Sequence, residues 1–213
     1  MPQKPTLEME QSLWKQGLLR VAGVDEVGLG CLAGPIVAAA VLLPPECEMI
    51  EGVRDSKVLS AATRSRLFNQ VKENAIAVGV GIATVQEIEQ INVLRASYLA
   101  MQRALSRIAP CDHALIDGRP IKQADLGLHT AIIDGDATCY AIACASIIAK
   151  VRRDRFMQRL AKRFPHYGWE RNAGYGTKQH LNAIEQFGIT PHHRRTYAPV
   201  QKAIEQLTLN LED

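Results

Sequence analysis

The chain has 213 residues, of which 47% are hydrophobic and 22% charged, and its formal net charge is +3. This composition is typical of a globular domain with ample material for a core, and it excludes a disordered or low-complexity chain. No apolar run approaches the roughly 18 residues of a membrane span, and residues 1–11 lack the apolar core of a secretory signal. Five cysteines without a C-x-x-C pair indicate reduced thiols in a cytoplasmic protein and argue against a zinc site.

The predicted elements mix strands and helices along the whole chain. Apolar periodicity and turn residues predict these elements in chain order: a short helix at 12–18, strands at 21–24 and 36–43 joined by a glycine-containing turn, a helix at 61–73, a strand at 76–83, a long helix at 85–108 broken near 91–92, strands at 114–117 and 129–133, a helix at 141–163, and a helix at 177–187 with Thr177 as N-cap. This order indicates a layered α/β domain with a C-terminal helical extension.

Acidic residues follow three of the predicted strands, each near a glycine. They are Asp25 with Glu26, Asp117 and Asp136. Strand ends that lie side by side would gather these carboxylates, and an all-carboxylate cluster favours Mg²⁺ or Mn²⁺, as one or two ions, over zinc. Such a site suits phosphoryl chemistry. The alternative for each acid is a solvated turn residue, which is how we interpret Asp134.

Positive charge is concentrated in one segment. Residues 150–195 hold eleven Lys or Arg against three acidic residues, a local charge of +8, so the remainder carries −5. This asymmetry indicates a polyanion-binding surface, and a solvated basic helix is the alternative. Within the segment, Lys150 and Asp154 lie one helical turn apart, which predicts an ion pair. A position for Asp154 in the outer shell of the metal site is the alternative.

Several short motifs occur in one order between residues 20 and 200. They are AGVDEVG at 22–28, LAGPIVAAAV at 32–41, DSKVL at 55–59, LIDG at 115–118, GD at 135–136, ASIIAKVRRD at 145–154, GYGT at 174–177 and PHHRR at 191–195. Together they resemble bacterial ribonuclease HII, the type 2 ribonuclease H. The number and order of the motifs make this resemblance specific.

The resemblance implies a ribonuclease H-like fold in a single domain, 1–213. That fold is a mixed five-stranded sheet flanked by helices, with a core over about 20–165 and a helical substrate-binding region over about 166–213. It implies metal-dependent hydrolysis of the RNA strand of RNA–DNA hybrids. It also implies incision on the 5′ side of single ribonucleotides embedded in duplex DNA, leaving a 3′-hydroxyl and a 5′-phosphate, as ribonucleotide removal during DNA replication and repair requires. The family's catalytic and metal-binding carboxylates map onto Asp25, Glu26, Asp117 and Asp136.

Substrate contacts are expected from a glycine turn, a tyrosine and several polar side chains. Backbone groups at Gly28 and Gly30 can approach a sugar closely because glycine has no Cβ. By resemblance, Tyr175 packs on the sugar beside the RNA–DNA junction, and a core tyrosine is the alternative. Contacts to phosphate, which position a duplex without reading its sequence, are expected from Ser56, Lys57, Lys150, Arg194 and Arg195. His192 and His193 remain unassigned.

The chain departs from the family pattern at Leu29, where an arginine normally stands between the two glycines. Leucine offers no planar donor fork to a phosphate, and loss of one charge-assisted contact costs about 1.5–3 kcal/mol. We therefore expect retained cleavage with weaker affinity or weaker preference for the junction.

The tail between Gln206 and Leu211 loosely resembles sliding-clamp-binding peptides. Asn210 departs from that pattern, which usually has an apolar or aromatic residue there. A terminal amphipathic helix or a disordered end is therefore the favoured alternative.

Two other functions stay open from the residues alone. One is a different metal-dependent nuclease on the same fold, such as a resolvase or an integrase-like enzyme. The other is a nucleic-acid-binding module without catalysis, which Leu29 favours and the carboxylates oppose, because acids repel phosphates unless a cation intervenes. The hybrid-specific endonuclease, as a cytoplasmic monomer, is the leading hypothesis.

Overall fold

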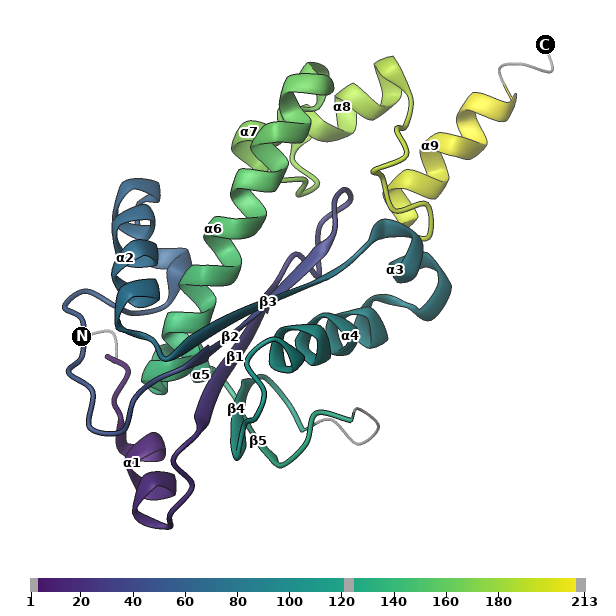
Figure 1. Cartoon of the computed structure of the whole chain (residues 1–213). Coiled ribbons are helices and arrows are strands. Elements are labelled where there is room, and N and C mark those ends of the chain that lie inside the picture. The colour runs from purple at the N-terminus through teal and green to yellow at the C-terminus, as the bar shows by residue number, and fades with distance from the viewer. Residues whose placement is uncertain (1–3, 121–124, 210–213) are drawn as a thin grey trace.

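A computed structural model describes residues 4–120 and 125–209. A five-stranded sheet with the order β3-β2-β1-β4-β5 forms its centre (Figure 1). The strands are β1 (Val21–Val27), β2 (Ile36–Leu42), β3 (Ala77–Ala83), β4 (His113–Asp117) and β5 (His129–Ile132). β2 pairs antiparallel with β1 and β3, whereas β4 pairs parallel with β1 and β5. The expected mixed five-stranded sheet is therefore confirmed.

Helices cover both faces of the sheet. They are α1 (Glu8–Lys15), α2 (Ala61–Asn74), α3 (Val85–Ile91), α4 (Val93–Ser106), α5 (Gly135–Thr138), α6 (Tyr140–Arg163), α7 (Trp169–Asn172), α8 (Lys178–Phe187) and α9 (Ala198–Leu209), with 3₁₀ turns η1 (Ser56–Val58) and η2 (Pro165–Tyr167). α6 packs on one face with α2 beside it, and α4 packs on the other face. The helices α7 and α8 lie beyond the sheet, near the far end of α6, and α9 follows α8 on the side away from α6 (Figure 1).

The central strand β1 is buried on both faces. Val21 belongs to the apolar cluster under α6, and Val24 belongs to the cluster under α4. Successive side chains of a strand point to opposite faces. The side chain of Asp25 therefore points to the α6 face of the sheet, and the side chain of Glu26 points to the α4 face.

Close approach of the two covering helices depends on glycines in the sheet. A Cβ at Gly23 of β1 would lie 2.0 Å from the backbone carbon of Ala141 in α6, and a Cβ at Gly81 of β3 would lie 1.8 Å from the carbonyl oxygen of Ala100 in α4. Both helices consequently rest on the backbone of the sheet, which a larger residue at either position would prevent.

Most predicted elements are confirmed within a few residues, and the long helix breaks where predicted. Asn92, with φ at 68°, is the N-cap of α4. Its side chain accepts hydrogen bonds from the amides of Leu94 and Arg95 at 3.0 and 3.1 Å. Thr177 is the predicted N-cap of α8 and accepts from the amide of His180 at 3.3 Å. Capping side chains define both boundaries in the structure, and for Thr177 this chemistry was the basis of the prediction.

Two boundaries were wrong. β1 does not end before the acidic pair but continues to Val27, because β2 pairs with Asp25 and Glu26 through Ala39 and Ala38. The first helix starts at Glu8, four residues before the predicted start.

The C-terminal segment forms the helix α9, which ends at Leu209. Gln206 to Leu209 of the clamp-like tail therefore belong to α9, and Asn210 and Leu211 lie outside the described residues. Over the described part of the chain, no helix has the length and apolar character needed to cross a membrane.

We expect Gly23→Ala to lower the free energy of unfolding by about 1–3 kcal/mol. The new methyl group would force α6 away from the sheet, since it would lie 2.2 Å from the Ala141 carbonyl oxygen. Gly30→Ala is the matched control, because a Cβ there meets nothing within 4 Å. Urea unfolding followed by circular dichroism measures both variants. Equal stabilities would contradict the close packing of α6.

Candidate carboxylate active site

Four acidic residues reach one edge of the sheet from three neighbouring parallel strands. Asp25 and Glu26 lie near the end of β1, Asp117 closes β4, and Asp136 lies in α5, which begins soon after β5. In the register of β1 and β4, Val24 pairs with Ile116, so Asp25 and Asp117 lie at the same level one residue further on. Parallel strands thus gather acids that are up to 111 positions apart in the chain.

Backbone hydrogen bonds hold two of these carboxylates. The amide of Gly135 donates to Oδ1 of Asp117 at 2.7 Å, which ties the start of α5 to the end of β4. The amide of Glu26 donates to Oδ1 of Asp25 at 2.7 Å. A Cβ at Gly135 would lie 3.2 Å from Oδ1 of Asp117. The short turn into α5 therefore sets the distance between Asp117 and Asp136.

Burial and mutual repulsion raise the pKa values of three of the four carboxylates. Burial raises the pKa of Asp25 well above its usual range, and the nearby charges of Glu26 and Asp117 raise it further. Burial and the charge of Asp117 raise the pKa of Glu26 to about 7. Burial and the charge of Asp136 raise the pKa of Asp117. Such mutual repulsion is relieved by protons or by a bound cation.

Lys57 supplies a positive charge inside the cluster. Its Nζ lies 2.9 Å from Oδ2 of Asp136. Desolvation lowers the pKa of Lys57, but the hydrogen bond to Asp136 and the charges of Asp136, Asp55 and Asp25 outweigh it and raise this pKa overall. The ammonium also lowers the pKa of Glu26 and Asp117, so it acts on the whole cluster. Its side chain is 73% exposed and remains open to solvent.

The donor chemistry of the cluster fits a hard divalent cation. All four side chains offer only oxygen, which Mg²⁺ and Mn²⁺ prefer. Oε2 of Glu26 is buried and has no hydrogen-bond partner among the described residues. In the described part of the chain, however, no three His, Cys, Asp or Glu side chains stand close enough together to hold an ion. Binding an ion thus requires these side chains to turn toward a common point.

The turn after β1 is exposed at Leu29 and Gly30, whereas Gly28 is buried and a Cβ there would lie 2.4 Å from Nε of Arg153. Gly28 has φ at +105°, a conformation that favours glycine. A Cβ at Gly30 would meet nothing within 4 Å, so the space above the turn is free. The carbonyl oxygen of Leu29 accepts a hydrogen bond from Nη1 of Arg194 at 2.8 Å and one from the Tyr197 hydroxyl at 2.5 Å. The Leu29 side chain is exposed.

Tyr175 lies in a second loop that contacts this turn. The carbonyl of Gly174 accepts from the amides of Leu32 and Ala33 at 2.8 and 3.3 Å. A Cβ at Gly174 would lie 2.4 Å from the carbonyl oxygen of Ala33, so the two loops are in direct backbone contact. Tyr175 itself is 42% exposed. The alternative of a core tyrosine is therefore wrong.

The expected phosphate contact from Arg194 is also wrong. Its side chain is completely buried. Its guanidinium donates to the carbonyl of Gly34 through Nε and Nη2, at 3.0 and 2.9 Å, and to the carbonyl of Leu29. Arg194 therefore supports the glycine turn from within, where a phosphate has no access.

The sequence analysis overlooked Arg153 of α6, the second buried arginine. It donates to the carbonyls of Pro35, Ala173 and Ala33 at 2.9, 2.7 and 3.0 Å and joins the two loops. Arg153 lies one helical turn before the buried Met157, on the apolar face of α6. An arginine on the apolar face of a predicted helix was the sequence signal that could have indicated its burial.

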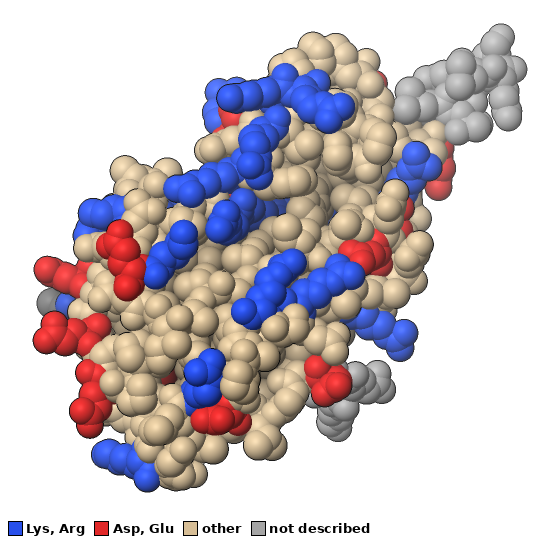
Figure 2. Space-filling view, viewed as in Figure 1, with Lys and Arg blue, Asp and Glu red and all other residues tan. Residues whose placement is uncertain are grey.

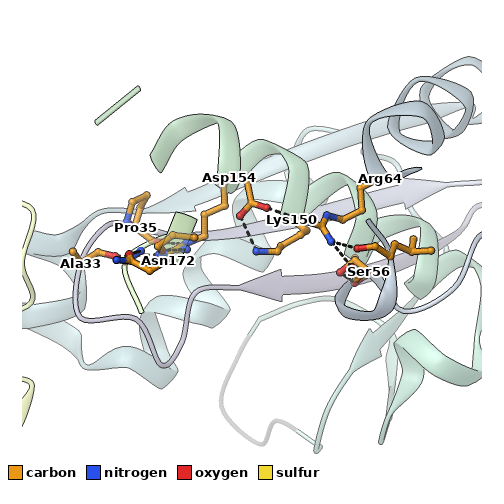
Figure 3. Close-up of polar contacts among 12 residues, drawn as sticks. Ala33, Pro35, Ser56, Arg64, Lys150, Asp154 and Asn172 are labelled. Carbon is orange, nitrogen blue, oxygen red and sulfur yellow. Dashed lines mark hydrogen bonds and ion pairs between the residues drawn. The ribbon is translucent and has the colours of Figure 1, made fainter. Parts of the chain in front are cut away.

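Five further polar residues form one chain of contacts along α6, most of which Figure 3 shows. Lys150 and Asp154 make the predicted ion pair, with Nζ and Oδ1 at 2.7 Å, and Arg64 of α2 lies 3.7 Å from Oδ2 of Asp154. Arg64 also donates to the carbonyl of Ser56 at 3.0 Å. The hydroxyl of Ser56 is buried against that of Ser146 at 2.7 Å, so its expected phosphate contact is wrong.

Positive side chains remain abundant on one face. Apart from Arg153, Arg194 and the half-buried Lys150, the basic residues of segment 150–195 are exposed, Arg195 among them. Figure 2 shows Lys and Arg side chains over α6 and α7 and a second group across an uncharged strip. The arrangement suits a polyanion lying along this face.

Comparisons with known proteins agree on one family. The family model described as Ribonuclease HII matches residues 22–200. A curated protein named Ribonuclease HII from Thermosynechococcus vestitus is 62% identical over 192 residues, covering 90% of each chain. The crystal structure of ribonuclease H2 from Pyrococcus horikoshii matches with a TM-score of 0.72 and 27% identity, covering 89% of this chain and 99% of that one. A ribonuclease HII solved in complex with PCNA from Archaeoglobus fulgidus matches with a TM-score of 0.72 and 25% identity, covering 84% and 95%.

The raised pKa of Glu26 predicts a pH-dependent stability of the metal-free protein. Folding raises this pKa from 4.5 to about 7, so between these values the folded state binds more protons than the unfolded state. The free energy of unfolding must then fall as pH rises through this window.

Glu26→Gln removes the charge and should reduce that fall by up to about 3 kcal/mol. Urea unfolding at pH 5 to 8 in the presence of EDTA measures it, with Glu73→Gln on the exposed surface of α2 as control. Parallel pH profiles for Glu26→Gln and the wild type would contradict the prediction.

Proposed function

We propose, because this chain belongs to the ribonuclease HII family, that the four carboxylates form its metal-binding catalytic centre. Membership makes the protein an endoribonuclease that acts on RNA–DNA hybrids. The finer activity that we propose is incision 5′ of single ribonucleotides in duplex DNA, leaving a 3′-hydroxyl and a 5′-phosphate. The observation that carries the proposal is the arrival of Asp25, Glu26, Asp117 and Asp136 at one sheet edge.

The carboxylates would hold Mg²⁺ or Mn²⁺, as one or two ions. When bound, these ions lower the pKa of a water molecule and stabilise the leaving oxygen. We assign Asp25 the central position, since it lies on the middle strand and feels the charges of the other three acids. Glu26 contributes its unpartnered Oε2, and Asp117 and Asp136 contribute from the neighbouring strands.

Lys57 would change partners during the reaction cycle. Its Nζ contacts Oδ2 of Asp136, and the ammonium would be repelled if Asp136 held a metal ion, because like charges repel. The exposed ammonium is then free to contact the phosphate, the role expected from its motif. Lys150, Arg195 and the outer-shell role of Asp154 stay predictions.

Discrimination of the sugar would belong to the joined loops. Telling RNA from DNA requires sensing the 2′-hydroxyl. The turn from Gly28 to Gly30, exposed at Leu29 and Gly30, follows the acidic pair of β1, and the segment after it contacts the Tyr175 loop. We propose that the backbone groups of this turn bind the 2′-hydroxyl and that the exposed ring of Tyr175 packs against the adjacent sugar. The side chain of Leu29 adds no donor to this contact. The exposed cationic side chains would position the duplex through its phosphates.

The partners and surroundings of the enzyme remain proposals. A relative from Archaeoglobus fulgidus has been solved with PCNA, and a sliding-clamp contact through Gln206 to Leu211 stays a prediction for this chain. The monomeric state and the cytoplasmic location likewise stay predictions.

A DNA duplex with one ribonucleotide tests the proposed function. We expect Mg²⁺- or Mn²⁺-dependent incision on its 5′ side, and a loss of at least about 100-fold in kcat for Asp25→Asn, since removing a ligand charge weakens both metal binding and transition-state stabilisation. Asp134→Asn is the matched control, because Asp134 is an exposed turn residue close to the same cluster. Metal-independent cleavage, or cleavage of a four-way junction without ribose, would refute the proposal.

Leu29→Arg tests the departure from the family pattern. The added guanidinium should raise kcat/KM for the single-ribonucleotide duplex about tenfold by restoring one charge-assisted contact. Leu19→Arg, at another exposed leucine, controls for the extra positive charge. An equal gain in both variants would show a nonspecific charge effect, and no gain would dispose of the idea.

A further inference from the structure

Two buried histidines touch each other behind the loop that carries Tyr175. His180 lies in the first turn of α8, and His193 precedes α9. They are 0% and 1% exposed, and their Nε2 atoms are 3.1 Å apart. Neither residue has a part in the proposed chemistry. Their fixed neighbours nevertheless determine where every ring proton lies.

The tautomer of His180 follows from two neighbours, one of which can only donate a hydrogen bond and the other only accept one. Nε1 of Trp169 lies 3.0 Å from Nε2 of His180, and an indole N–H can only donate. Nε2 of His180 therefore accepts. Nδ1 of His180 lies 2.9 Å from the carbonyl oxygen of Tyr175, which can only accept. The ring proton of His180 must consequently sit on Nδ1.

The tautomer of His193 is the opposite one. Its Nδ1 lies 2.9 Å from the backbone amide of Thr190, which donates, so Nδ1 accepts. The proton then sits on Nε2 and is donated to the bare Nε2 of His180. Burial lowers the pKa of both rings, that of His193 to about 3, which leaves both neutral at pH 7. In this one set of tautomers, Trp169 and His193 share the single lone pair on Nε2 of His180 as a three-centre hydrogen bond.

We propose that this histidine pair is a positioning device for Tyr175, a relay of hydrogen bonds from the Thr190 amide through His193 and His180 to the Tyr175 carbonyl. The inference rests on the proposed contact of Tyr175 with the sugar. The amide of Tyr175 is also bound, to the carbonyl of Asn172 at 2.9 Å. Both sides of the residue are thus fixed while its ring stays exposed, which is the condition for a preorganised contact.

The position of the relay favours this role over a purely structural one. Trp169, Tyr167 and the two histidines already fill the core between α7 and α8. Two ring donors leave this core: the Tyr167 hydroxyl donates to the carbonyl of Gly188, and Nδ1–H of His180 donates to the carbonyl of Tyr175, whose side chain faces solvent. His180 is therefore a positioning residue, because it acts on the substrate only through Tyr175.

The proton positions can be measured in the intact protein. Long-range ¹H–¹⁵N correlation spectra at pH 7 distinguish the two neutral tautomers and the charged ring. We expect the Nδ1–H form for His180 and the Nε2–H form for His193. A charged ring, or the reversed pair of tautomers, would overturn the relay.

A mutant cycle measures whether the relay acts through Tyr175. An asparagine amide can take the place of Nδ1 and keep the donor to the Tyr175 carbonyl, whereas a glutamine amide takes the place of Nε2 and loses it. We expect His180→Gln to lower kcat/KM for the single-ribonucleotide duplex about 10- to 100-fold. We expect His180→Asn to recover most of that loss. In a Tyr175→Ala background, His180→Gln should lower kcat/KM for the same duplex by less than about threefold.

An equal loss from His180→Gln in both backgrounds would refute the positioning role. Circular dichroism and urea unfolding accompany each variant, and the wild-type spectra decide the tautomers if a variant does not fold. Absence of incision by the wild-type protein would refute the proposed function while leaving the tautomer measurement intact. Incision by the wild type with independent effects at His180 and Tyr175 would refute only the positioning role.

Discussion

The substrate side of this protein depends on two buried guanidinium groups that make no ion pair with any described carboxylate. Arg153 and Arg194 direct their donors at backbone carbonyls of segment 29–35 and at Ala173. A buried charge without hydrogen bonds is very costly. Neither loop can therefore move away without leaving a guanidinium unsatisfied, and this constraint keeps the glycine turn and the Tyr175 loop together.

The carboxylate cluster next to these loops has the opposite character. Its charges repel one another, its pKa values are raised, and Lys57 provides compensation that is exposed and easily withdrawn. The carboxylate cluster is thus adaptable, while the loops that would recognise the sugar are held by several hydrogen bonds. A firmly held recognition surface with an adaptable carboxylate cluster would place the substrate accurately while the ligands adjust to the ions.

The same constraint joins the sheet to the C-terminal helices. Leu32 and Ala33, from the segment between β1 and β2, belong to one apolar cluster with Trp169 of α7 and Ile184 of α8. The isolated bridge between Ala33 and His193 adds a backbone contact across the same boundary. The strand that carries Asp25 and Glu26 therefore continues into a loop that packs against the C-terminal helices. This packing fixes the position of the carboxylates relative to the cationic face.

The sequence by itself determined the five strands, the longer helices, the break near Asn92 and the position of the acids after neighbouring strands, because periodicity and short motifs are local signals. The short helices α5 and α7 were not among the predicted elements. Only the tertiary structure decided which polar side chains face water. Arg194 and Ser56 carry the chemistry of phosphate ligands in the sequence, yet both are buried, and Arg153 was overlooked because its partners lie up to 120 positions away. A side chain's own chemistry does not reveal which distant carbonyl or hydroxyl the fold will bring to it, since that depends on how separate loops pack.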